Sequence, residues 1–198
     1  MSDSVRLSRP DGLKGEIIIS SDPIYFFLSC LCASFARGDS EFLNYSSSYQ
    51  CNLFLEWFEA IELDFQIEPH SLILTGKSQE WQPKFKETIF ELSHYHLANL
   101  LWAELLLFSG WSVLTFEGEP SQLQAFAELT KKYLHAEGHV KGQNLHLTRS
   151  EVPELNHEYQ FTQAEPLLRN ILTLRHFLAH ESIRTQEPYA LQVSLSSL

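Results

Sequence analysis

The residues of this chain whose types could do chemistry are concentrated between Thr162 and Ile183. This stretch predicts an amphipathic helix, because leucines recur at helical spacing among arginines and histidines. A guanidinium binds phosphate through paired N–H donors, and an imidazole transfers protons near neutral pH. Three interpretations are open: a catalytic pair, a metal site, or a helix face that is simply exposed to water.

An ideal helix separates these polar side chains into two groups. Arg169, His176 and His180 fall within about 60° of one another and form one polar stripe. Arg175 lies about 140° from His180, on the side of Leu178. We therefore expect Arg175 to need a partner, a kink in the helix or a crevice.

Residues 175–181, RHFLAHE, resemble the motif of HEPN domains, in which an arginine and a polar residue are followed after a short spacer by histidine. Arg175, His176 and His180 occupy those three positions, and Glu181 also fits the motif. A second, overlapping match joins Arg169 and Asn170 to His176. We prefer the first register because its Ala-His-Glu ending also agrees.

The resemblance implies a mainly α fold, an HEPN-like helical bundle with a few short peripheral β-strands. It implies a homodimer in which two motif helices form one cleft that cleaves RNA without a metal, so no cofactor is expected. A role as a toxin or defence effector, with a protein partner such as an antitoxin, is a further expectation from the resemblance. The implied roles are His180 as acid or base, Arg175 as phosphate clamp and His176 as supporting polar group, with Arg169, Asn170 and Glu181 as further support.

Two alternatives to a ribonuclease remain. In a non-catalytic helical interaction module, Arg175 and His180 would hydrogen-bond to neighbouring helices. In a metal-dependent enzyme, histidines four residues apart could share an ion on one helix face, and Glu-x-x-His pairs could contribute carboxylates. The matching pairs are His176 with His180, His135 with His139, Glu91 with His94, and Glu154 with His157.

The charge of the chain bears on its partners. A net charge of -11 and a pI near 5.2 argue against a broad nucleic-acid surface, which needs clustered lysine and arginine. Residues 166–186 are the exception, because they contain three arginines and one glutamate. We expect any anion site here to be a small positive cleft in an acidic surface.

Cysteine usage and hydropathy predict a soluble cytoplasmic protein. The three cysteines, Cys30, Cys32 and Cys51, do not suit a disulfide framework and suggest reduced thiols. Residues 1–12 lack the apolar core of a signal peptide. The longest apolar run contains Asn99 and Glu104 and is too short to span a bilayer, so no membrane partner is expected.

The elements that would position the motif predict one α-rich domain. It covers residues 12–198 after a flexible N-terminus at 1–11, with the motif helix at about 163–184. The apolar spacing predicts earlier helices at 23–37, 40–65, 79–109 and 119–137. Strands are predicted at 13–20, 71–76, 111–118, 139–149 and 189–195. No internal repeat is visible in the sequence.

Overall fold

A computed structural model describes most of the chain between residues 22 and 149. The described residues are 5–7, 22–43, 45, 47–69, 71–77, 83, 87–149, 170, 171, 174, 175, 178 and 183–185. Near the two ends, β1 (Val5–Leu7) pairs with β9 (Ile183–Thr185) in an antiparallel two-stranded sheet. The predictions for residues 13–20 and 189–195 lie outside the described residues.

The first structural unit alternates helices with an antiparallel sheet. Its elements are α1 (Pro23–Ser34), β2 (Arg37–Leu43), α2 (Tyr49–Ala60), β3 (Asp64–Ile67) and β4 (Ser71–Lys77). The strand order is β2-β4-β3, with β4 antiparallel to both neighbours. Asp22 and Pro23 begin α1 as the sequence predicts, because the Asp22 carboxylate accepts the Ile24 N–H at 3.0 Å.

The second unit repeats this order of elements. Its elements are β5 (Ile89–Glu91), α3 (His96–Phe108), β6 (Val113–Glu117), α4 (Pro120–Leu134), β7 (Glu137–Lys141) and β8 (Asn144–Thr148). The strand order is β5-β6-β8-β7, in which β5 is parallel to β6 and the other pairs are antiparallel. The series α1-β2-α2-β3-β4 therefore corresponds to α3-β6-α4-β7-β8, a structural repeat that the sequence does not reveal.

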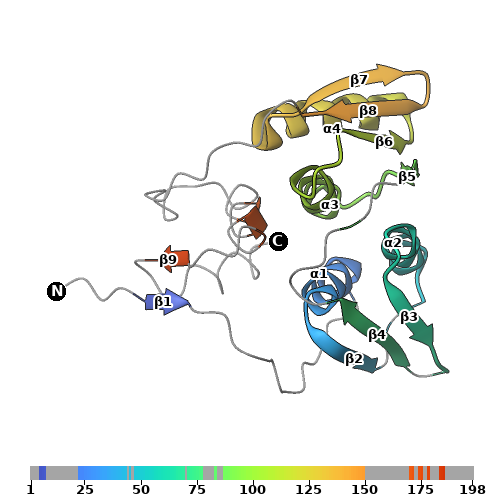
Figure 1. Ribbon diagram of the computed structural model, residues 1–198. Coiled ribbons are helices and arrows are strands. Elements are labelled where there is room, and N and C mark those ends of the chain that lie inside the picture. The colour runs from blue at the N-terminus through green and yellow to red at the C-terminus, as the bar shows by residue number, and fades with distance from the viewer. Residues whose placement is uncertain are drawn as a thin grey trace.

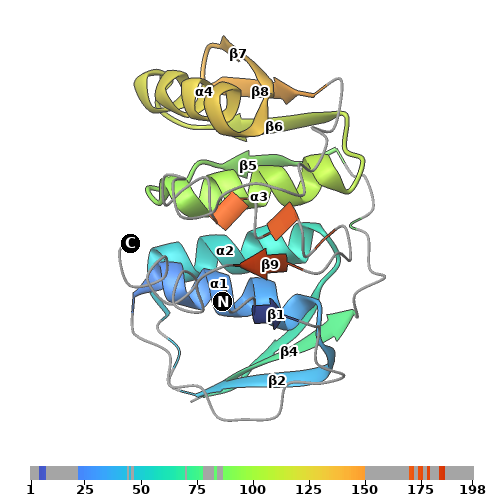
Figure 2. The same cartoon turned by 90° about the vertical axis from the view of Figure 1, so that its left-hand side faces the viewer.

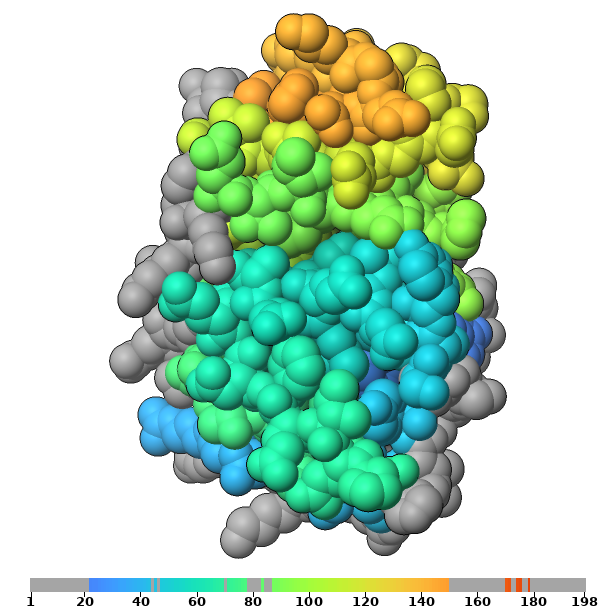
Figure 3. Space-filling model, turned by 90° about the vertical axis from the view of Figure 1, so that its right-hand side faces the viewer, coloured from blue at the N-terminus to red at the C-terminus, as the bar shows by residue number. Residues whose placement is uncertain are grey.

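The two units stack with helices between their sheets. Figures 1 and 2 show α1, α2 and α3 side by side between the sheet of the first unit and the sheet of the second, while α4 lies with β6, β8 and β7. Figure 3 shows one face of the molecule, on which the first unit (blue to teal) and the second (green to orange) meet along a continuous boundary. The helices therefore form the middle of the molecule.

Aromatic side chains join the two units at this boundary. Trp57 of α2 and Trp102 of α3 stack with ring centroids 5.5 Å apart, and both are almost fully buried. Phe27 of α1 packs against the edge of Trp102 at 6.5 Å, and Phe116 of β6 against Trp57 at 6.4 Å. Such rings bury large apolar areas, so this cluster holds the helices in fixed positions.

The expectation of a mainly helical, HEPN-like bundle is wrong. The described residues form a mixed α/β fold in which extensive sheets flank the helices. Residues 40–43, predicted as helix, belong to β2, which pairs with β4 from Arg37 opposite Lys77 to Leu43 opposite Ser71. The helix predicted at 79–109 is also too long, because residues 89–91 form β5 and α3 begins at His96. In both cases pairing with distant strands overrides the local helical spacing.

Other predicted elements are confirmed. Helices α1 and α4, strand β4 and strand β6 lie within the predicted ranges, give or take a few residues. The hairpin of β7 and β8 covers most of the predicted segment 139–149, and Gly142 makes its turn with φ 65°. No helix in the described part of the chain is long and apolar enough to cross a membrane.

Candidate functional site

The predicted catalytic motif is only partly described. Positions 170, 171, 174, 175 and 178 are helical. His176, His180, Arg169 and Glu181 lie outside the described residues, so their predicted roles have no structural test. Asn170 is half-buried, and its amide nitrogen has no hydrogen-bond partner among the described residues. Residues 183–185, at the end of the predicted motif helix, form β9.

Arg175 is buried against α3. Its Nε donates to Glu104 Oε1 at 2.6 Å, and its Nη2 donates to Glu104 Oε2 at 3.2 Å and to the Tyr133 carbonyl at 3.3 Å. The residue is 4% exposed and Glu104 is fully buried. Of the partner, kink or crevice expected for Arg175, the structure shows a partner, and the bidentate pair attaches the helical residues around Arg175 to α3.

The metal-site alternative does not match the described geometry. His135 ends α4 in the left-handed conformation, with φ 54°, and His139 lies on β7, so the two do not share a helix face. Glu91 accepts a short hydrogen bond from the Tyr49 hydroxyl. Within the described residues, no group of three or more His, Cys, Asp or Glu side chains could hold a metal ion. Glu154, His157, His176 and His180 lie outside these residues.

The N-termini of the helices meet at one end of the molecule. The Ser93 hydroxyl, just before α3, donates to Gln50 Oε1 at the start of α2, at 2.7 Å. Burial raises the pKa of Tyr95, the residue that precedes α3, and the Asp22 carboxylate at the start of α1 acts in the same direction. Residues from three different helix N-termini therefore lie within electrostatic range of one another.

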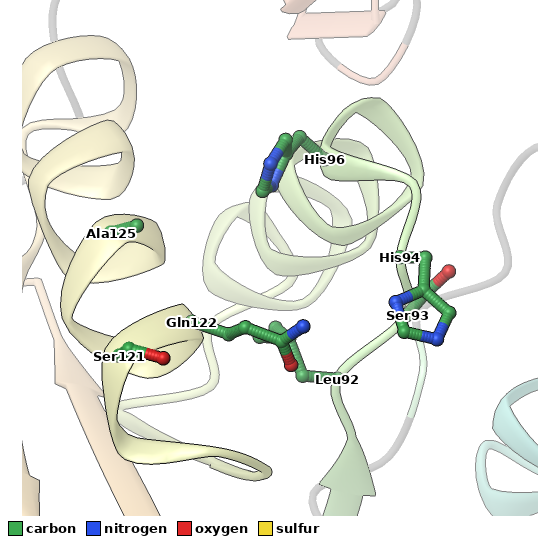
Figure 4. Close-up of a pocket in the computed structure, with 7 residues that line it drawn as sticks. All are labelled: Leu92, Ser93, His94, His96, Ser121, Gln122 and Ala125. Carbon is green, nitrogen blue, oxygen red and sulfur yellow. The ribbon is translucent and has the colours of Figure 1, made fainter.

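A pocket of about 230 Å³ lies at this end, between α3 and α4. Leu92, Ser93, His94 and His96 line it from the segment that enters α3, and Ser121, Gln122 and Ala125 line it from the first turns of α4. Figure 4 shows both imidazoles on one side and the Gln122 side chain extending from α4 toward Leu92. His94, His96, Ser121 and Gln122 are exposed, so a ligand could reach them.

The helices that line the pocket differ from their counterparts in the first unit. Asp22 caps α1 and Ser48 caps α2, each by accepting a backbone N–H of the first turn. Neither α3 nor α4 has a side-chain cap, although Tyr95 and Glu119 occupy the N-cap positions. First-turn N–H groups have no partner inside a helix and carry partial positive charge. The first-turn donors of α3 and α4 therefore have no side-chain acceptor at the N-cap.

Asn99 fixes the entry into α3. Its Oδ1 accepts the Ser93 N–H at 3.0 Å, and its Nδ2 donates to the Ser93 carbonyl at 2.8 Å. The Ser93 hydroxyl also accepts the Tyr95 N–H at 3.1 Å. Since Asn99 and Ser93 are buried, these bonds hold the turn that carries His94 and His96 in one conformation.

Comparison with known proteins bears on the fold. No protein-family model and no curated protein matches the chain. The structure is similar to that of an EPSP synthase from Acinetobacter baumannii, with a TM-score of 0.56 and 12% sequence identity. The similarity covers 82% of this chain and 38% of that enzyme. This chain thus shares an α/β fold with about two fifths of the synthase.

These comparisons overturn the HEPN interpretation. The similar structure is an α/β enzyme, and no HEPN family model matches RHFLAHE in its sequence context. The expected HEPN ribonuclease, with its toxin or defence role, is therefore wrong. A short arginine–histidine pattern arises in a helix without any catalytic role, and Arg175 here forms a buried ion pair. Homodimer formation stays a prediction.

The sequence interpretation missed most of the pocket. In the sequence, His94 stands out only as half of a Glu-x-x-His pair, and His96 falls inside the helix predicted at 79–109. The sequence does predict the start of α4, because Glu119-Pro120-Ser121 is typical of a helix N-terminus. The sequence does not indicate where α3 starts, because tyrosine, the residue at its N-cap position Tyr95, is not a residue type that predicts an N-cap.

Proposed function

We propose that the chain is a ligand-binding domain that holds a small anionic molecule, with a carboxylate or phosphate group, in the pocket between α3 and α4. The observation that carries this proposal is the pair of uncapped helix N-termini on one pocket. Helix N-termini bind anions because their free N–H groups and their dipoles both favour negative charge. The pocket accepts only a small group.

The side chains of the pocket support the same ligand. The imidazoles of His94 and His96 donate hydrogen bonds and carry positive charge when protonated. Ser121 and Gln122 add a hydroxyl and an amide at the first turn of α4. None of the described residues that line the pocket is acidic, in contrast to the strongly acidic protein as a whole. A local excess of hydrogen-bond donors in an acidic protein surface favours the binding of one anion at this pocket over unspecific binding of anions elsewhere on the surface.

The similarity to an EPSP synthase is compatible with ligand binding and does not assign a reaction. The chain spans 38% of that enzyme, at 12% identity, so the synthase's activity is not carried over. The fold of that enzyme shows that this arrangement of elements can serve an enzyme that handles small molecules. We propose that this chain uses the fold to bind a small anion. Any reaction would depend on chemical groups other than those that line the pocket.

Calorimetric titration with inorganic phosphate tests the proposal. We expect His96→Gln and Ser121→Ala each to weaken binding about 3- to 10-fold, since one charge-assisted hydrogen bond contributes about 1 kcal/mol or more. Glu119→Gln should strengthen binding, because it removes a negative charge beside the uncapped start of α4.

The matched control is His139→Gln, at an exposed histidine on β7. It should bind phosphate as the unchanged protein does. Equal affinity in all four variants, or no measurable binding by the unchanged protein to phosphate or succinate, would reject the proposal.

The cytoplasmic location stays a proposal. Its support is that all three cysteines, Cys30, Cys32 and Cys51, are free thiols, the state that a reducing compartment maintains. Burial also raises the pKa of Cys30, so this thiol resists ionisation and oxidation.

A further inference from the structure

A second cluster of charges lies inside the molecule, away from the pocket. Glu104 of α3 accepts hydrogen bonds from Arg175 and, through Oε2, from Arg149 Nη1 at 2.8 Å. The side chains are 0% exposed for Glu104, 2% for Arg149 and 5% for Arg175. Two guanidiniums thus share one carboxylate, and among the described residues one positive charge of the cluster has no counter-charge.

Arg149 carries the incompletely bonded group. Its Nη2 is buried and has no hydrogen-bond partner among the described residues. Arg175, in contrast, uses both Nε and Nη2 on Glu104 and reaches the Tyr133 carbonyl as well. A buried, unbonded guanidinium nitrogen is costly, because it loses water without gaining an acceptor.

We propose that this cluster is a second anion site, in which a compact oxyanion, a carboxylate or a phosphate, binds Arg149 Nη2 and neutralises the extra charge. A guanidinium presents its N–H groups as a planar fork that matches two oxygens of such an anion. Glu104 fixes the fork from one side through Nη1, so Nη2 is oriented before the anion arrives. Arg149 is the binding residue, and Arg175 is a positioning residue that holds Glu104.

The electrostatics of Arg149 agree with this assignment. Burial lowers the pKa of Arg149, and the charge of Arg175 acts in the same direction, while Glu104 opposes both. An anion on Nη2 would remove this destabilisation. Glu104 lies eight residues after His96 on α3, about 12 Å along the helix axis, so this site is separate from the pocket.

Thermal unfolding in formate, phosphate and chloride at equal ionic strength tests the site. We expect formate or phosphate to raise the melting temperature of the unchanged protein by about 3 °C or more over chloride at ten times the dissociation constant. The salt that raises the melting temperature shows whether the site binds a carboxylate or a phosphate. Arg149→Met should lose the part of this response that comes from the buried cluster, while the contribution of the pocket between α3 and α4 remains. The control Arg37→Met, which removes an exposed arginine from β2, should keep it.

His96→Gln separates this site from the pocket, because it should keep the response at Arg149. If Arg149→Met does not fold, arginine side-chain NMR of the unchanged protein decides. A guanidinium signal that shifts with formate or phosphate and not with chloride supports the site. Equal melting temperatures in all three salts, a response of undiminished size in Arg149→Met, or no anion-specific shift overturns it.

Discussion

At the scale of single residues, Glu104 has the largest structural consequence. It is a fully buried carboxylate in a mostly apolar helix, and it binds Arg149 and Arg175 from two different parts of the chain. Removing one partner from a buried ion pair leaves the other charge without solvent or partner. Glu104 therefore links α3 to β8's end and to the C-terminal helix.

Neutralising this carboxylate should destabilise the protein strongly. We expect Glu104→Gln to lower the free energy of unfolding by about 3 to 5 kcal/mol, because two guanidiniums then lack a counter-charge. Urea unfolding measures the difference. Glu56→Gln, at an exposed position of α2, should change it by less than about 0.5 kcal/mol. Similar values for the two variants would contradict the structural role of Glu104.

Tyr49 offers a test by pH. Its hydrogen bond to Glu91 raises the pKa of Tyr49 to about 12. Because an unfolded tyrosine ionises near pH 10, the stabilisation from this pair is complete below about pH 10 and is lost as the pH rises toward 12. Absorbance titration of the unchanged protein against Tyr49→Phe should give a difference curve with its midpoint near pH 12. A midpoint near pH 10 would show that the bond does not persist in solution.

At this scale the sequence predicts the special position of Arg175 and does not predict the contacts of the other buried polar residues. The angular position of Arg175 on its helix predicts a partner, a kink or a crevice, but helical geometry cannot identify Glu104, which is 71 residues away. Asn99 and Glu104 were noted only as polar breaks in an apolar run. Their partners Ser93, Arg149 and Arg175 are set by packing between elements, which spacing along the chain does not contain.

At the scale of elements, close packing constrains β4 against α1. A Cβ added at Gly76 would lie 2.5 Å from the Ala33 carbonyl oxygen and still closer to that of Ala36. Both are backbone atoms, one in the last turn of α1 and the other in the bend between α1 and β2, so they cannot move without shifting the backbone there. The position requires glycine for space, and the contact fixes how the helix meets the sheet.

Gly76→Ala should therefore lower the free energy of unfolding by about 2 kcal/mol or more. The matched control is Gly118→Ala, whose Cβ would make an ordinary contact of 3.4 Å with Leu92. We expect the control to change stability by less than about 1 kcal/mol. Denaturant unfolding of both variants compares them, and an equal loss in both would argue against the tight contact between β4 and α1.

Elements with strong local signals were predictable, and elements made by distant pairing were not. Asp22-Pro23 and Glu119-Pro120 mark the starts of α1 and α4, and both are where the sequence places them. Strands β2 and β5 were predicted as helix, because Phe42 and Ile89 fall at helical spacing from later apolar residues. Their strand conformation comes from pairing with β4 and β6.

At the scale of the whole molecule, the same order of helices and strands occurs twice, and we propose that only the second copy binds a ligand. Both units place two helices against a sheet in the same order, yet only the helices of the first unit are capped by side chains. We propose that the uncapped starts of α3 and α4 make the pocket of the second unit a ligand site. The sequence does not show this repeat, because the two units share their order of elements and strands but not their residues.

Amide NMR of the protein during titration with inorganic phosphate tests the central claim most directly. If an anion binds at the two helix N-termini, the backbone N–H signals of His96, Leu97, Ser121 and Gln122 should shift together with one dissociation constant. The signals at the capped starts of α1 and α2 should stay in place. Shifts at those capped helices instead, or none at α3 and α4, would contradict the account.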